Sequence, residues 1–255
     1  MILRKMADAI AAQSWFTVVL EVLIVVVGIF IGLQVDDWNK TRQDRVRETE
    51  YLQRIEVELE QDIAAFEDGL VIAGQRREYA QLILTGLDDP ETVRREPTAY
   101  IRSLVMAGFT YFPIVSNHTF EEIKSAGELG IIEDVELRIA ITEYYQRVRQ
   151  YGQWSYLREL NQSEYLKRQA GILTAEQFQA FWISSSGHGR DFSEEEAETA
   201  YQNMLSRPAF IEWLPITLAF LNEADEFQRD FKENAEKLRE NIAANLGMDS
   251  TGHGE

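Results

Sequence analysis

The residue types best suited to catalysis or metal binding form no recognisable pattern in this sequence. The three histidines, His118, His188 and His253, lie far apart, and none belongs to an H-E-x-x-H or related ligand motif. A G-x-S-x-G nucleophile motif is absent as well. We therefore predict no catalytic residue, no metal site and no cofactor, and we do not expect an enzyme.

Acidic residues are abundant, but their spacing selects no acid–base pair. Glu56, Glu58, Glu60 and Asp62 are interpreted as exposed residues of a helix. The run Glu194-Glu195-Glu196 is typical of a solvated face or of a first helical turn. These carboxylates are therefore predicted to be surface residues.

Glu21 is the ionisable residue in the most informative place, because it lies inside an apolar run from Trp15 to Val35. About 20 apolar residues are what a helix needs to cross a bilayer. The run is too long for the core of a signal peptide, and no small-residue cleavage site follows it. We predict a retained single-pass span over residues 15–35, with Trp15 and Trp38 as the aromatic residues at its two membrane interfaces.

One face of this span combines the acid with small residues. At 100° per residue, the face contains Thr17, Glu21, Val25, Gly28, Gly32 and Val35. Gly28 and Gly32 form a small-xxx-small pair, which lets two helix backbones approach closely. Thr17, Glu21, Val25, Gly28 and Gly32 are therefore the predicted contact between spans. Two alternatives stay open: glycine is common in spans, and Glu21 is close enough to one end to reach the headgroups.

The composition limits the possible partners. The chain has 255 residues, a net charge of -18 and no cysteine. The negative charge argues against nucleic acid, because phosphate binding needs a basic surface. The absence of cysteine excludes disulfides and cysteine-ligated metals, and leaves the redox compartment undetermined. The roughly 210 residues beyond the span suffice for one large domain with its own core.

Two charge arguments about membrane orientation disagree. The positive residues after the span favour a cytoplasmic C-terminal side; they are Lys40, Arg42, Arg45 and Arg47. A short basic tail before a first span commonly stays inside, and here it carries Arg4 and Lys5. Charge alone leaves the orientation open.

The rest of the chain is helical in character. One apolar face runs from Leu52 to Leu70, a weak point is expected at Gly69–Gly74, and Pro90 follows the end of the element. Residues 88–97 are interpreted as a loop. Further helices are expected over about 98–108, from Ser116 or Asn117 to Gly127, over about 134–169, and with Pro215 in the first turn of the last helix. Residues 184–190, rich in serine and glycine, are interpreted as a plain connection.

The predicted fold class is all-α: an N-terminal transmembrane helix that continues into a long stalk helix, with a mostly antiparallel helical bundle. The natural neighbour of the stalk helix is the last helix, whose apolar stripe must be buried. The expected boundaries are 1–14 for an N-terminal tail, 15–35 for the transmembrane helix, 36–87 for the stalk and first bundle helix, 88–246 for the bundle, and 247–255 for a disordered tail.

Two blocks of the sequence resemble a family of bacterial single-span membrane proteins that carries only a domain-of-unknown-function label. The first block is Glu21, Val27-Gly28-Ile29, Ile31, Leu33-Gln34, Trp38-Asn39 and the helix from Glu50-Tyr51-Leu52 to Glu60-Gln61-Asp62. The second runs from Thr119 to Leu129 and on to Ile131-Ile132 and Tyr144-Tyr145. The resemblance implies a bacterial inner-membrane protein with a helical domain. It also implies that the N-terminal tail stays inside, which would make the C-terminal domain periplasmic. It implies no reaction.

These observations favour a membrane-anchored helical scaffold or accessory protein that forms a homo-oligomer through its span. The lipid bilayer and further copies of the chain are the expected partners, and another membrane protein is a further candidate. One alternative is an extracytoplasmic sensory or ligand-binding domain, with the aromatic helix around Trp154 lining a pocket and a partner supplying the output. The other is ion or proton passage through an oligomer lined by Glu21.

Overall fold

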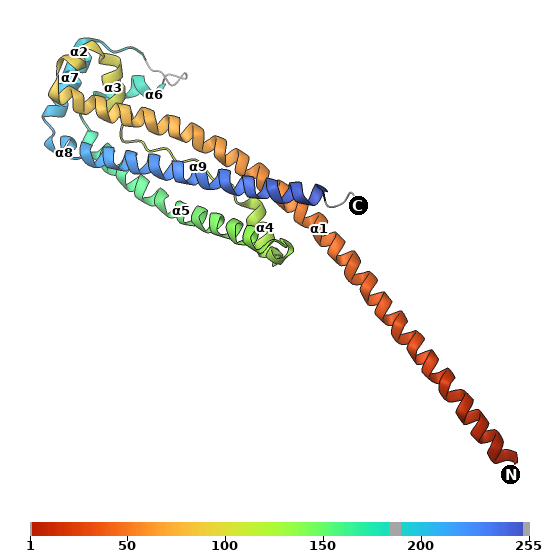
Figure 1. Ribbon diagram of the computed structural model, residues 1–255. Coiled ribbons are helices and arrows are strands. Elements are labelled where there is room, and N and C mark those ends of the chain that lie inside the picture. Colours follow the sequence, from red (N-terminus) through yellow and green to blue (C-terminus); the bar gives the residue numbers. More distant parts are fainter. Residues whose placement is uncertain (1, 184–189, 252–255) are drawn as a thin grey trace.

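A single helix of 87 residues, α1 (Ile2–Asp88), forms both the N-terminal rod and one side of the bundle (Figure 1). The computed structural model describes the backbone of residues 2–183 and 190–251, and the side chains of residues 19–151, 156, 158–181 and 190–247. At about 1.5 Å per residue, α1 is roughly 130 Å long. Because no break interrupts it, the helical phase of the apolar rod continues into the bundle.

Shorter helices and two long ones complete the fold, and no strand occurs in the described ranges 2–183 and 190–251. In chain order after α1 they are α2 (Glu91–Arg95), α3 (Pro97–Met106), α4 (His118–Ala126), the 3-10 helix η1 (Leu129–Ile131), α5 (Val135–Gln169), α6 (Ala175–Ile183), α7 (Glu194–Leu205), α8 (Pro208–Ile211) and α9 (Leu214–Thr251). The expected all-α fold is confirmed.

Three long helices, α1, α5 and α9, lie side by side in the bundle (Figure 1). An extended segment, residues 107–117, returns the chain from the end of α3 to the start of α4, near the point where the rod enters the bundle. As a result α5 runs in the same direction as α1. The last helix, α9, runs antiparallel to both, and it packs most extensively on α1, as expected from its apolar stripe.

Two hydrophobic clusters fill the bundle along its length. The cluster nearer the rod joins Leu52, Ile55, Leu59 and Phe66 of α1 to α4, the first half of α5 and the second half of α9. The distal cluster joins Ile83 of α1 to α2, α3, α7, α8, Tyr165 of α5 and the first half of α9. Both ends of the bundle therefore have a core of their own.

Several expected boundaries agree with the structure, and some do not. The helix over 134–169, the left-handed Gly127 at the end of α4 (φ 72°) and Pro215 in the first turn of α9 are confirmed. The expected weak point at Gly69–Gly74 does not interrupt α1, and α2 lies inside the stretch interpreted as a loop. The backbone of α9 continues to Thr251, past the expected start of the tail at Gly247. Residues 184–189 and 252–255 lie outside the described part of the chain.

Candidate functional site

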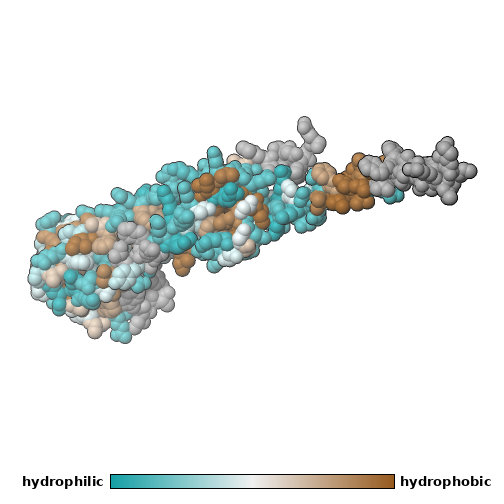
Figure 2. All heavy atoms as spheres, turned by 90° about the horizontal axis from the view of Figure 1, so that it is seen from below, coloured by the Kyte–Doolittle hydropathy of each residue, from teal (hydrophilic) through white to brown (hydrophobic). Residues whose placement is uncertain are grey.

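The described part of the rod has an apolar surface that no other element of the chain covers. Every residue from Val19 to Lys40 is exposed, and an 18-residue window within Val19–Asp88 has a mean hydropathy of 2.3. Figure 2 shows this surface in brown, next to a bundle that is mostly hydrophilic. Among the described residues, this is the one straight helix long and apolar enough to cross a membrane.

The predicted contact residues in the rod are open to a partner. Glu21 and Val25 are exposed, and a Cβ added to Gly28 or Gly32 would meet no heavy atom within 4 Å. Trp38, the predicted interfacial aromatic residue, is 67% exposed. The side chains of the other two predicted residues, Trp15 and Thr17, lie outside the described ones.

The bundle lies on the opposite side of α1 from this stripe. At 3.6 residues per turn, Val46 lies about five turns after Gly28, and Val57 about ten turns after Glu21. Val46 and Val57 are each 53% exposed and Val71 is 63% exposed, and all three continue the stripe along the outer face of α1. The bundle therefore leaves this face of α1 accessible at the described positions from Glu21 to Val71.

Charged pairs hold the α4–η1 region onto α1 where the rod enters the bundle. Arg47 contacts Asp44 and Glu128, each at 2.6 Å, and the Tyr51 hydroxyl donates to Glu128 at 3.0 Å. An open cleft of about 410 Å³ lies beside these groups, between the Lys40–Glu48 stretch of α1 and Gly127–Glu133. Three basic and four acidic side chains line the cleft, so it has no marked preference for a ligand of one charge.

The prediction that Glu58 and Asp62 are surface residues is wrong for Asp62, which is 2% exposed, and Glu58 is partly buried. Asp62 accepts the Ser116 N–H at 2.9 Å, and Glu58 accepts the N–H of Thr119 at 3.0 Å and its hydroxyl at 2.7 Å. Both acids lie close to the buried face of α1 and satisfy backbone donors of the incoming chain. Local spacing could not show this, because the donors lie more than 50 residues away in the sequence.

The first turn of α4 is capped by a side chain from α1. Asn117 occupies the N-cap position, as one of the two expected caps, but its side chain makes no capping hydrogen bond. Instead Glu58, on α1, accepts the N–H of Thr119 in the first turn. The cap therefore comes from a distant helix rather than from the preceding residue.

Most of the described aromatic residues of α5 pack in the core, whereas Tyr156 is 68% exposed. Tyr145 stacks on Phe120 with ring centroids 4.5 Å apart, and Tyr151 stacks on Phe227 at 5.4 Å. Beside Phe112 and Phe227, an apolar cavity has a volume of about 30 Å³. Such a space holds about one water. Trp154 lies outside the described side chains. The packing of the described aromatic residues thus offers no support for a ligand pocket in this helix.

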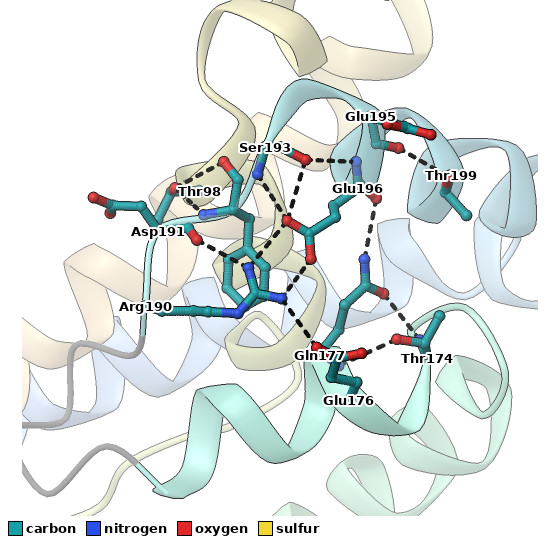
Figure 3. A network of polar contacts seen from close by, with 11 residues as sticks. Thr98, Thr174, Glu176, Gln177, Arg190, Asp191, Ser193, Glu195, Glu196 and Thr199 are labelled. Carbon is teal, nitrogen blue, oxygen red and sulfur yellow. Dashed lines mark hydrogen bonds and ion pairs between the residues drawn. The ribbon is translucent and has the colours of Figure 1, made fainter.

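A polar network at the far end of the bundle joins α3, α6 and α7 (Figure 3). Arg190 donates to both carboxylate oxygens of Glu196, at 3.0 and 2.6 Å, and Ser193 and Glu196 form a capping box at the start of α7. The hydrogen bonds from Arg190 and from the Ser193 N–H lower the pKa of Glu196 to about 2. The network is satisfied within the chain, and it anchors α7.

Glu196→Ala is expected to lower the free energy of unfolding by about 1 kcal/mol at pH 7, because it removes half of the capping box. Since the folded-state pKa lies below the ordinary value, this contribution is present above about pH 4.5 and declines as the pH falls toward 2. Urea unfolding of the full-length wild type and variant, at pH 7 and again near pH 2, measures how this stability difference depends on pH. Glu195→Ala, on the neighbouring exposed position, should change stability by less than about 0.5 kcal/mol; an equal loss in both variants would refute the role of the cap.

Of the three histidines, the structure describes His118. His118 is exposed at the start of α4, while His188 and His253 lie outside the described residues. Within the described part of the chain, no group of three histidine or carboxylate side chains is arranged to hold a metal ion.

The fold and the exposed rod define a class of protein: a helical bundle continuous with one helix of membrane-spanning length. Residues 21–171 match a family of unknown function, DUF6090. The match covers more than half of the chain, and the chain belongs to this family. The matched region includes the predicted contact residues from Glu21 to Gly32. It also includes Glu58 and Asp62, whose carboxylates accept hydrogen bonds from residues 116–119. No curated protein and no solved structure matches the chain.

Proposed function

We propose that the protein is a membrane-anchored scaffold or accessory protein, without catalytic activity, that self-associates through the stripe of Glu21, Val25, Gly28 and Gly32. The observation that carries the proposal is the position of this stripe on an unbroken helix whose bundle lies on the other side. Two copies can therefore bring their spans together without a clash between their bundles. The close approach allowed by the glycines and a hydrogen bond from or to Glu21 would stabilise the contact.

We further propose that the span lies in a bacterial inner membrane, with the bundle in the periplasm. The basic N-terminal tail, which carries Arg4 and Lys5, supports this orientation. Protease digestion of intact spheroplasts tests it, because a periplasmic bundle is cleaved from outside. Full protection of the bundle until the membrane is permeabilised would reverse the assignment.

Disulfide crosslinking gives a direct test of self-association, because the chain has no native cysteine. A single Val25→Cys variant, oxidised in native membranes, is expected to form a covalent dimer. Phe30→Cys is the matched control, since it lies about 140° around the same helix and is 63% exposed. Disulfides need Cα atoms about 4.4–6.8 Å apart, so the two positions should differ strongly in yield.

The same reporter tests the individual contact residues. Adding Glu21→Ala to Val25→Cys removes an interhelical hydrogen bond worth about 0.6–2 kcal/mol, a loss of roughly 3- to 30-fold in association. Adding Gly28→Leu should reduce crosslinking further, because the backbones can no longer approach. Equal dimer yields at Val25 and Phe30, or no effect of either added substitution, would contradict self-association through this stripe.

Ion passage through the assembly is a separate prediction. Liposomes that contain the wild type and the Glu21→Gln variant distinguish it from a purely structural contact. A flux that depends on Glu21 would support passage, and equal background flux in both would exclude it.

A further inference from the structure

The extended segment 107–117 is held on α1 by a buried carboxylate with no cation beside it. Asp62 is 2% exposed, and its two oxygens accept the Ser116 N–H at 2.9 Å and the Tyr144 hydroxyl at 3.3 Å. In the described part of the chain, neither its hydrogen bonds nor its electrostatic neighbours include a basic side chain. A buried carboxylate usually has such a partner, because an unpaired buried charge is costly.

The groups that face Asp62 are few. From α1 comes Glu58, one turn earlier, which repels the ionised form. From α5 come Tyr144 and Tyr145, and burial raises the pKa of each hydroxyl. The Tyr144 hydroxyl donates to Asp62, and the Tyr145 hydroxyl donates to Glu58 at 3.5 Å. The segment contributes the backbone N–H of Ser116. Within the described residues, no charged side chain of α4 or α9 contacts the carboxylate.

A second buried acid shows how the chain treats a carboxylate that stays charged. Asp225 on α9 is 6% exposed, but its Oδ2 lies 3.3 Å from Arg77 and 3.0 Å from Arg229. Both guanidinium groups compensate for the buried charge. Asp62 lacks this compensation, so its ionised form is disfavoured while segment 107–117 covers it.

Burial raises the pKa of Asp62 to about 6; the hydrogen bonds from Ser116 and Tyr144 oppose the increase, and Glu58 adds to it. When the segment separates from α1, water reaches the carboxylate and its pKa returns toward 3.8. The ionised form therefore favours separation, while the protonated form tolerates burial. The free energy by which ionisation of Asp62 favours the open segment grows as the pH rises from about 4 to 6, and then stays constant.

We propose that Asp62 is a pH-sensitive latch: protonation keeps segment 107–117 closed on α1, and ionisation makes its opening more frequent. The latch does not depend on self-association, because all its groups belong to one chain. Opening would also free the start of α4, since Glu58 binds Thr119 two residues after the segment. The latch would therefore make the local pH determine how often segment 107–117 and the start of α4 separate from α1.

Hydrogen–deuterium exchange of the full-length protein in lipid nanodiscs tests the latch. After correction for the intrinsic exchange rate, opening of the segment around Ser116 is expected to be about 20-fold more frequent at pH 7.5 than at about pH 4.5. Asp62→Asn should abolish this dependence, because the amide can accept from Ser116 and donate to Tyr144 without titrating. Wild-type and Asp62→Asn profiles that coincide would overturn the proposal.

Two further variants separate the latch from a general effect on folding. Glu48→Gln alters another buried carboxylate of α1, which accepts the Glu133 N–H at 2.7 Å, and should leave the pH profile of segment 107–117 unchanged. Tyr144→Phe removes a hydrogen bond to the ionised carboxylate, so the midpoint of the profile should move to higher pH. If Asp62→Asn does not fold, an unshifted midpoint in Tyr144→Phe would still refute the latch.

Discussion

Tyr165→Ala is expected to lower the free energy of unfolding by about 3–5 kcal/mol, because it empties the centre of the distal cluster. Tyr165 is fully buried, its ring lies 5.3 Å from that of Phe210, and its hydroxyl donates to the Leu104 carbonyl at 2.9 Å. A Cβ on Gly108 would lie 2.2 Å from the ring, so the backbone of the turn already touches it. The surroundings cannot readily close around the vacated volume. Urea unfolding of the full-length protein in nanodiscs, followed by circular dichroism, measures the loss.

The hydroxyl and the ring of Tyr165 can be separated experimentally. In Tyr165→Phe the Leu104 carbonyl keeps its second donor, the side-chain amide of Gln169. The expected loss is therefore only about 1 kcal/mol. Similar losses for the phenylalanine and alanine variants would mean that the hydrogen bond, rather than the packing of the ring, stabilises this end of the bundle.

Phe66→Ala is expected to lower the free energy of unfolding by about 3–5 kcal/mol, because it removes a buried ring from the cluster nearer the rod. Phe66 is fully buried, and its ring centroid lies 5.9 Å from Phe231 and 6.2 Å from Tyr151. It thus joins α1 to both other long helices. Val57→Ala, on the exposed outer face of the same helix, is the matched control and should change stability by less than about 0.5 kcal/mol.

The two large substitutions also test whether the clusters act independently. Phe66 and Tyr165 belong to different clusters and share no contact. The losses in the double variant should therefore add to within about 0.5 kcal/mol. A markedly smaller combined loss would show that the two cores are coupled through α1, α5 and α9.

Long periodic elements were the part of the fold that the sequence predicted best. The apolar faces of the stalk helix and of the last helix have a 3.6-residue period over many turns, so their existence and their mutual packing followed from hydrophobic burial. The helix over 134–169 was predicted for the same reason. Short elements such as α2 and α8 have too few residues for a period to be seen, and contacts with α7 stabilise them.

The roles of buried polar residues were not predictable. Asp62 has the spacing of a surface acid on a helix rich in glutamate, and only the approach of Ser116 makes it a buried acceptor. Asn117 has the right type and position for a cap, yet a tertiary contact from Glu58 replaces it. In both cases the partner lies far away in sequence, where neither propensity nor periodicity carries information. The stripe of Glu21, Gly28 and Gly32 needed only helical phase, which is why it could be proposed from sequence.

The pairing of α1 with α9 has a consequence for synthesis of the chain. The apolar face of α1 is made early, but Phe231 and its neighbours emerge about 165 residues after Phe66, which at about 5–20 residues per second is roughly 8–30 s later. Throughout that interval the face from Leu52 to Phe66 lacks its partner α9, and α5 itself is complete only about 103 residues after Phe66. With the proposed span inserted, a nascent chain would hold this uncovered surface beside the membrane, so its need for chaperones should be greatest before α9 is complete.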